Sequence, residues 1–458
     1  MPEPFTILRD LMRLRFLILL AICTSLWAQP LPVAPKSHLT DITPKAGFFN
    51  EPSIAVNPLD PQQLVVAWQV NASVAYSTDA GQNWTVAQGT APKDYKISGD
   101  VSITYDGTGH ALLCYIAFDK LGTTNYWAHG ATRNGIFVRR SLDGGKTWEA
   151  DADTVMAHQS TPDIPFEDKP WIVADTSGRH PGYIYVGWTQ FTLSASDLLF
   201  SRSTDDGKTW SAPIKLNRVS GLPRDDNGAL EGFHGVVGPD GTLYTIWGSR
   251  DGIMMAVSHD AGASFAKDRR VIPAGPGYFG ITGVARSNGF PQIAIGPRAG
   301  NTNKSQATGD LYVSWSDYSN GDVDVFVSSS ANQGETWSVP VRVNNDPLHN
   351  GADQFFQWMS VDPKSGAVSL VFYDRRPDNA RTSVTLARST DAGKTFENYA
   401  LDQESFQAEG DFLGDYTAIT SFGNKIWAAW AHQTSEATAL TGTRKTRTLL
   451  RVGRADFN

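Results

Sequence analysis

Carboxylate side chains recur at one point of the sequence, directly before short apolar segments that have the composition of strands. They are Glu51, Asp100, Glu167, Asp168, Glu231, Asp353 and Asp415, with His234 and Tyr416 in matching places. If the fold brings these points together, the carboxylates converge, and converging carboxylates cannot all stay ionised. Some must be protonated, paired with arginine or bound to a cation, and each state can support acid–base chemistry. The alternative is that they accept hydrogen bonds from backbone N–H groups or face water.

A repeated pattern of eight residues indicates the elements that must position these residues. The pattern is serine, any residue, aspartate, any, glycine, any, threonine or serine, and an aromatic residue. It occurs six times, at 77–84, 141–148, 203–210, 258–265, 330–337 and 389–396, with Asn332 for the aspartate of the fifth copy and Asn83 for the hydroxyl residue of the first. Successive serines lie between 55 residues apart (Ser203 to Ser258) and 72 apart (Ser258 to Ser330). A repeat of this length with several short strands per unit is typical of β-propeller blades.

The residue types of the pattern explain why each copy should be a tight turn. Aspartate accepts hydrogen bonds from nearby backbone N–H groups, and glycine adopts the positive φ that other side chains resist. The aromatic residue then starts the next strand and buries a large apolar area. We call these six segments the serine–aspartate turns and expect each to join two antiparallel strands.

Two strand-like segments precede every serine–aspartate turn, and one further couple follows the last turn. The couples are 52–56 with 64–68, 102–105 with 112–118, 171–174 with 183–188, 235–237 with 243–247, 292–295 with 311–315, 359–361 with 368–373, and 416–419 with 425–430. The last unit continues with a third strand at 446–452 but lacks a fourth. Residues 38–43 could supply it and close the ring without an open sheet edge. We therefore predict an all-β fold, a seven-bladed propeller of four-stranded antiparallel blades.

In such a propeller the turn between the third and fourth strands of each blade lies on one face. The connections between blades, and those between the second and third strands, lie on the other. The carboxylates and the loops that hold Arg250, Arg375 and Arg376 all belong to this second face. We therefore expect the functional site opposite the serine–aspartate turns.

The repeated pattern resembles the Asp-box, or BNR repeat, and the chain is similar to the sialidase (neuraminidase) superfamily over nearly all of residues 29–458. The resemblance implies a glycan-directed site, and exo-α-sialidase activity as one form of it, although sialidases have six blades. In that family three arginines hold the sugar carboxylate, a glutamate activates a tyrosine nucleophile and an aspartate is the acid/base. Carried over in chain order, it implies Asp100, Glu231 and Tyr416 as catalytic residues. Arg250, Arg375 and Arg376, with Glu51, Asp168 and Asp415 from the carboxylate set, would contact the substrate.

One family position departs from the resemblance. The Phe-Arg-Ile-Pro motif that carries the first arginine corresponds here to Phe49-Asn50-Glu51-Pro52. Asparagine supplies neither the charge nor the two parallel donors of arginine, and Glu51 would repel an anionic sugar. Two alternatives therefore stay open. One is a different carbohydrate-active enzyme, a hydrolase or lyase that uses His234 or Tyr416. The other is a non-catalytic module that binds glycan or protein through aromatics such as Tyr126, Trp127, Phe279 and Trp358.

The ends and the composition of the chain limit the remaining possibilities. Three arginines precede an apolar run in residues 1–28, which is the layout of a secretory signal peptide, so we expect a secreted or periplasmic protein with one domain at 29–458. A formal charge of −8 gives no basis for nucleic-acid binding. Cys114 is expected to be a buried thiol, and the histidines lack metal-ligand spacing. We expect a monomer with no cofactor, with a structural Ca²⁺ at the carboxylates as an open alternative.

Overall fold

The computed structural model describes residues 30–87, 92, 94–119, 131–159, 165–275, 277–297, 309–408, 412–437 and 444–458, without the side chains of 435–437 and 444–446. Residues 1–28, Tyr126 and Trp127 therefore lie outside the described residues. The strands all belong to the unit Leu31–Asn458. Within the described ranges no helix has the length and apolarity that a membrane crossing requires.

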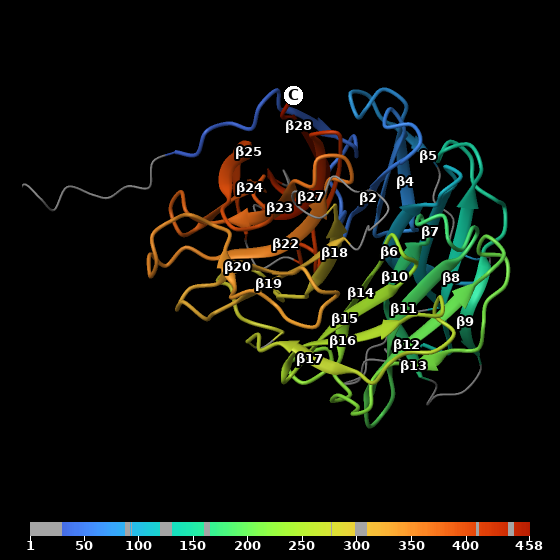
Figure 1. Ribbon diagram of the computed structural model, residues 1–458. Helices are drawn as coiled ribbons and strands as arrows, with labels where there is room; N and C mark the ends of the chain where they lie inside the picture. Colours follow the sequence, from blue (N-terminus) through green and yellow to red (C-terminus); the bar gives the residue numbers. More distant parts are fainter. Residues whose placement is uncertain are drawn as a thin grey trace, which may run out of the picture. The chain divides into compact units, whose positions relative to one another are not determined.

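Seven four-stranded antiparallel sheets form the unit, each pairing its strands in chain order except the last (Figure 1). Blades 1 to 3 are β2 (Ser53–Val56), β3 (Leu64–Trp68), β4 (Ser73–Ser77), β5 (Thr85–Ala87); β6 (Ile97–Tyr105), β7 (Ala111–Phe118), β8 (Arg133–Ser141), β9 (Asp153–Gln159); and β10 (Phe166–Ala174), β11 (Ile184–Phe191), β12 (Ser196–Ser203), β13 (Ile214–Lys215). Blades 4 and 5 are β14 (Glu231–Val237), β15 (Leu243–Ser249), β16 (Gly252–Ser258), β17 (Arg269–Ile272); and β18 (Gln292–Gly296), β19 (Asp310–Asp317), β20 (Asp324–Ser330), β21 (Val341–Arg342). Blades 6 and 7 are β22 (Gln354–Val361), β23 (Val368–Asp374), β24 (Arg381–Ser389), β25 (Glu397–Gln407); and β26 (Ala418–Phe422), β27 (Lys425–Ala437), β28 (Arg444–Asp456), β1 (His38–Asp41).

The blades form a closed ring. The inner strands β2, β6, β10, β14, β18, β22 and β26 contact one another in that order, and β26 contacts β2. Blade 7 is completed by the N-terminal strand β1, whose His38 pairs with Arg454 and Asp41 with Arg451 of β28. The seven-bladed all-β propeller and its closure by residues near 38–43 are thus confirmed, and the six-bladed alternative is not observed.

The core lies between adjacent blades, where the second strand of each is buried on both sides. β3, β7 and β23 are buried along their whole length, and Trp188, Trp247, Trp427 and Trp430 are completely inaccessible. One apolar cluster joins blade 1 to blade 2 and another joins blade 6 to blade 7, so no blade buries its apolar faces alone. Cys114 is a buried free thiol within β7.

The six serine–aspartate turns share one hydrogen-bond arrangement. In each, the serine Oγ accepts the backbone N–H of the glycine at 2.8–2.9 Å and donates to the Asp or Asn side chain. The six glycines have φ between 75° and 99°, which explains the residue type. Each turn joins the third strand of a blade to the fourth, as the sequence pattern predicts.

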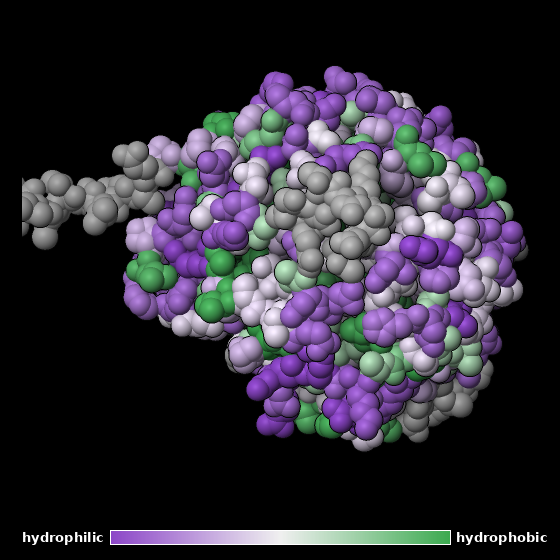
Figure 2. All heavy atoms as spheres, in the orientation of Figure 1, coloured by the Kyte–Doolittle hydropathy of each residue, from purple (hydrophilic) through white to green (hydrophobic). Residues whose placement is uncertain are grey.

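Exposed large apolar side chains occur in several blades among the described residues. Val219 and Val339 are 79% and 83% exposed and lie in separate blades, and Figure 2 shows polar residues mixed with apolar ones over the viewed face. Single exposed apolar residues are ordinary on a protein surface.

Candidate functional site

The site is built on irregular starts of the inner strands. At equivalent places, two residues before regular pairing begins, Glu51, Asp100, Lys169, Gly232 and Phe356 have φ of 52°, 45°, 47°, 71° and 51°. Register shifts accompany this backbone in β6, β10, β14 and β22. A left-handed conformation costs a non-glycine residue about 1 kcal/mol or more and persists where the surroundings enforce it. Such bulges re-aim side chains, here toward the central axis.

These starts lie at the opposite ends of the strands from the serine–aspartate turns. On β11, Ser203 of the third turn pairs with Ile184, whereas Asp168 pairs with Thr189. Five residues of strand separate the two pairs by about 17 Å. The structure therefore places the turns and the carboxylates on different faces, as expected.

Asp415 is the centre of the polar cluster. Its Oδ2 accepts hydrogen bonds from Lys169 Nζ at 2.7 Å and from Arg286 Nη2, and its Oδ1 accepts one from Arg286 Nε at 2.8 Å. Asn288 Nδ2 donates to its carbonyl oxygen at 3.0 Å. Burial by itself raises the pKa of Asp415, but Lys169 and Arg286 outweigh burial and hold the pKa below the usual range. Asp415 is therefore an ionised carboxylate that joins two cations.

Tyr278 lies beside this ion cluster, between Glu231 and Asp225. Its hydroxyl donates to Glu231 Oε2 at 2.5 Å and also contacts Asp225, whose other oxygen binds Arg286. Burial, Glu231 and Asp225 raise the pKa of Tyr278, so the phenol keeps its proton. Burial and the neighbouring Asp225 also raise the pKa of Glu231 well above its usual value. A chain of groups that share protons thus runs from Glu231 through Tyr278 to Asp225.

Glu51, Asp100 and Asp168 form the other side of the cluster. Burial raises the pKa of Asp168, and so do the charge of Asp100 and a side-chain hydrogen bond with it. The pKa of Glu51 is raised by burial, Asp100 and Asp415. Opposite shifts in neighbouring carboxyl groups, with the pKa of Asp415 lowered and the pKa values of Glu51 and Asp168 raised, are the arrangement that separates acids from bases in catalytic sites.

Aromatic rings close the channel beneath this cluster. The ring of Trp171 lies 4.5 Å from His234 and 5.2 Å from Trp358, and Trp358 lies 5.3 Å from Tyr416. Trp171 and Trp358 belong to blades 3 and 6, which are not neighbours, so their contact crosses the axis. Burial lowers the pKa of His234 to about 3, so its imidazole is neutral.

Two cavities adjoin the cluster. One of about 320 Å³ sits against the aromatic rings and is lined by Lys169, Trp171 and Tyr416. The other, of about 450 Å³, lies between blades 4 and 5 and is lined by Glu231 and Tyr278. Phe290 and Pro291 contribute to both cavities, which therefore flank one wall.

Six of the candidate residues come together in this cluster: Glu51, Asp100, Asp168, Glu231, Asp415 and Tyr416. Tyr416 is 5% exposed, its hydroxyl donates to the carbonyl of Val101 at 3.4 Å, and Lys169 Nζ lies 5.2 Å from its ring. Burial, Glu51 and Asp100 raise the pKa of Tyr416. No described contact joins Tyr416 to Glu231, which instead binds Tyr278.

The candidate arginines lie elsewhere. Arg250 is exposed in the β15–β16 turn. Arg375 is buried over the ring of Phe355, and burial lowers its pKa despite the nearby Asp353. Arg376 donates to Asp374 at 2.6 Å. Within the described residues, no hydrogen bond or ion pair connects these three arginines to Asp415, Glu231 or Asp100.

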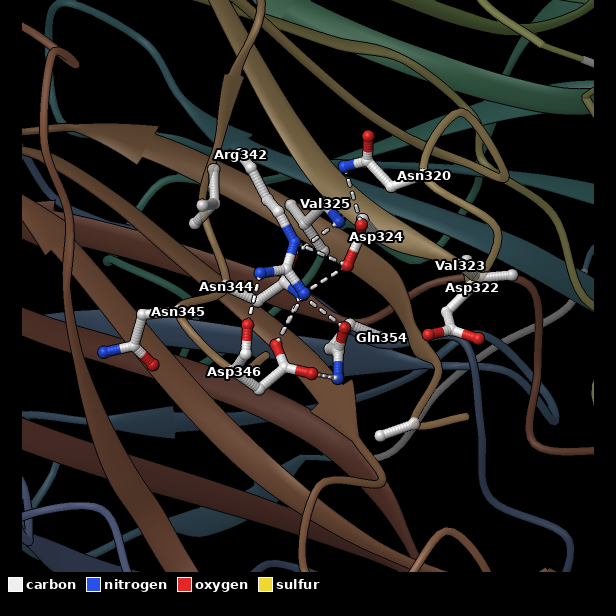
Figure 3. A network of polar contacts seen from close by, with 12 residues as sticks. Asn320, Asp322, Val323, Asp324, Val325, Arg342, Asn344, Asn345, Asp346 and Gln354 are labelled. Atoms are coloured by element: carbon white, nitrogen blue, oxygen red, sulfur yellow. Dashed lines mark hydrogen bonds and ion pairs between the residues drawn. The ribbon is translucent and has the colours of Figure 1, made fainter. Parts of the chain in front are cut away.

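Arg376 borders a second polar network, between blades 5 and 6. Figure 3 shows Arg342 between Asp324 and Asp346, with Asn344 and Gln354 completing the contacts. Gln354 also donates to Asp374 at 3.2 Å, the partner of Arg376. The carboxylates here are all paired, so this network holds two blades together.

Lys169, Arg286, Asp225 and Tyr278 were not anticipated from the sequence. Lys169 follows the predicted Asp168 directly, which is a local signal. Tyr278 and Arg286 lie in the segment between β17 and β18, where residue type alone does not show which side chains reach the axis. Glu167 was anticipated at the site, but it is completely buried within its blade, with Trp188 and Gln190 donating to it.

No group of three or more His, Cys, Asp or Glu residues in the described ranges is arranged to hold a metal ion. No protein-family model matches the chain, and no curated protein matches it. Among solved structures, the Hadza microbial sialidase Hz136 is similar at 17% identity over 86% of this chain and 73% of that one, with a TM-score of 0.47. A Penicillium chrysogenum α-L-arabinanase complexed with arabinobiose (15% identity, 78% and 96%, TM-score 0.44) and a polysaccharide lyase, an ulvan lyase (10%, 88% and 93%, 0.45), are also similar. Similarities this low assign no activity to this chain.

Proposed function

We propose that this chain cleaves glycosidic bonds by acid–base catalysis at the carboxyl cluster around Asp415. The observation that carries the proposal is the division of one cluster into an ionised carboxylate, Asp415, and neighbouring carboxyl groups held protonated, Asp168 and Glu231. Glycoside cleavage needs a protonated carboxyl group for the leaving oxygen and a second group across the bond. The Asp-box resemblance and the strained backbone at Glu51, Asp100 and Lys169 support the same site.

In this proposal Asp168, which shares a hydrogen bond with Asp100, donates the proton to the leaving oxygen. Tyr278 and Glu231 act from the other side as the tyrosine–glutamate pair that the family resemblance implies. The phenol oxygen attacks the anomeric carbon as the bond to the leaving oxygen breaks, and the phenol proton passes to Asp225, which contacts it. Tyr278 therefore takes the role that the sequence order had suggested for Tyr416.

The charges favour an uncharged or cationic glycan over a sialoside. Lys169 and Arg286 are both paired with Asp415, and Arg286 also with Asp225, so neither is free to hold a sugar carboxylate. Glu51 stands next to Asn50, where the family has its first arginine. An anionic sugar would therefore find neither Lys169 nor Arg286 available as an unpaired cation in the cluster.

The test is product release from sialosides, uronic polysaccharides and neutral glycans, followed by chromatography. Asp168→Asn and Glu231→Gln should each lower turnover about 10²–10⁴-fold, the usual contribution of a positioned acid or base. The control is Glu335→Gln, an exposed carboxylate on the opposite face. Full turnover in Asp168→Asn would refute the proposal. Turnover of a sialoside that vanishes in Arg250→Ala would instead support a sialidase.

A further inference from the structure

The cavity between blades 4 and 5 has an uneven charge. Its wall contains the acids Asp226 and Glu231, and none of the residues that line it is lysine, arginine or histidine. Arg250 belongs to the turn between two lining residues, Ser249 and Gly252, but is not part of the wall. A ligand in this cavity therefore meets negative or neutral groups only.

Glu231 supplies the cavity with a free acceptor. The residue is 2% exposed, and its Oε2 is occupied by Tyr278. Its Oε1 is buried and has no hydrogen-bond partner among the described residues. A buried acceptor without a partner is destabilising, so a donor that fills this position is favoured. The cluster repeats the pattern nearby, because Glu51 Oε2 and Asn50 Oδ1 are likewise buried without described partners.

The rest of the wall suits a sugar ring. Phe290, Pro291 and Trp315 offer apolar surface, and six glycines leave the backbone accessible. Sugar sites combine such flat apolar surfaces with a few placed polar groups.

We propose that this cavity is a glycan subsite that takes a sugar unit bearing a free, positively charged amino group. The inference rests on the proposed function, since it names the substrate class of the same site. The ammonium group donates to Glu231 Oε1, and its charge offsets the acids of a wall that contains no cation.

A linked proton provides a second signature. The groups that face Glu231 are Asp225, Asp168, Lys169 and Tyr278. Burial, Asp225 and Asp168 raise its pKa and outweigh Lys169 and the hydrogen bond from Tyr278, which lower it. An ammonium group beside Glu231 favours its charged form, so binding at a pH below this raised pKa should release a proton. Titration calorimetry in two buffers of different ionisation enthalpy measures that release.

The experiment uses calorimetry to compare β-1,4-linked trimers of glucosamine, N-acetylglucosamine and glucose with the α-1,4-linked trimer of galacturonic acid. The host is the slowed variant Asp168→Asn, which limits cleavage. The glucosamine trimer should bind about ten- to a hundred-fold more tightly than the acetylated and glucose trimers, and the galacturonate trimer should bind least. Glu231→Gln keeps the shape and removes the charge, so it should abolish this preference.

Two glycine variants separate the cavity from general attraction between a cationic sugar and an acidic protein. A Cβ at Gly277, which lines the cavity, meets no atom within 4 Å, so Gly277→Val adds bulk there without displacing the backbone. Gly280 in the same segment is equally open but is not in the wall, which makes Gly280→Val the matched control. Gly277→Val should bind the glucosamine trimer at least ten-fold more weakly, and Gly280→Val should bind it with unchanged affinity.

The outcomes distinguish the two proposals. Selective binding of the amine without turnover of any glycan by the wild-type protein supports the subsite and overturns the hydrolase. Turnover of glycans combined with equal or absent binding of the amine trimer overturns the subsite and leaves the hydrolase standing. Amine binding that survives Gly277→Val, or that releases no proton, also overturns the subsite.

Discussion

The replacement Asp415→Asn tests whether the ion cluster at the axis stabilises the propeller. Asp415 and Lys169 are 2% and 8% exposed, and their charged atoms are 2.7 Å apart. Arg286 has 35% of its side chain exposed and contributes less because water screens it. Removing the carboxylate leaves Lys169 buried without its main partner, which costs about 3–5 kcal/mol.

This cost converts to a melting temperature. The entropy of unfolding is about 2.1 cal/mol/K per residue, so a unit of roughly 430 residues has about 0.9 kcal/mol/K. A loss of 3–5 kcal/mol therefore lowers the melting temperature by about 3–6 °C, measured by scanning calorimetry at pH 7. The exposed Glu335→Gln variant should shift it by less than about 1 °C.

The double variant Lys169→Met with Asp415→Asn decides the cause. Once the lysine charge is absent, the missing carboxylate leaves less charge unpaired. The melting temperature of the double variant should therefore fall by less than the sum of the falls in the two single variants. Strictly additive losses, or a shift in Asp415→Asn no larger than in Glu335→Gln, would refute the assignment of Asp415 as the partner that neutralises Lys169.

Three further results are expected. Glu51→Gln should raise the melting temperature at pH 8 and leave it nearly unchanged at pH 4. Burial and Asp100 raise the folded pKa of Glu51, so its contribution to stability falls as pH rises above its unfolded pKa. A lower melting temperature of Glu51→Gln at pH 8 would contradict this. The pKa of Asp205 is about 2 because hydrogen bonds from its turn outweigh slight burial. The stabilisation by Asp205 is therefore lost as the pH falls from about 4 to 2. Asp205→Asn, which copies the Asn332 of the fifth turn, should weaken this acid dependence of the melting temperature. Burial raises the pKa of Cys114, so its thiol should react with a chromogenic disulfide reagent only after denaturation, and rapid labelling of the native protein would disprove its inaccessibility.

The ring and its closure were predictable because their signals are local. Each serine–aspartate turn carries its own glycine and hydroxyl requirements, and the couples of apolar segments count the blades directly. The missing fourth strand of the last unit pointed to the N-terminal segment, where β1 lies.

The detail of the site was less predictable because it depends on backbone irregularities. In the run Glu167-Asp168-Lys169, the positive φ of Lys169 and the register shift after Asp168 send Glu167 into the blade and Lys169 to Asp415. Regular alternation of side chains along a strand does not predict that Glu167 and Lys169 point to these two different places. Arg286 and Tyr278 reach the axis from a connection between blades, and only the folded path of that connection brings them to Glu231 and Asp415.

The contact of Trp171 with Trp358 across the axis has a consequence for traffic through the molecule. A polymer cannot thread from one face of the ring to the other at that level, because side chains from opposite blades meet there. Any chain that reaches the carboxyl groups from one face of the ring must therefore leave by that same face. Long glycans would therefore have to present a free end or an exposed side branch to that face.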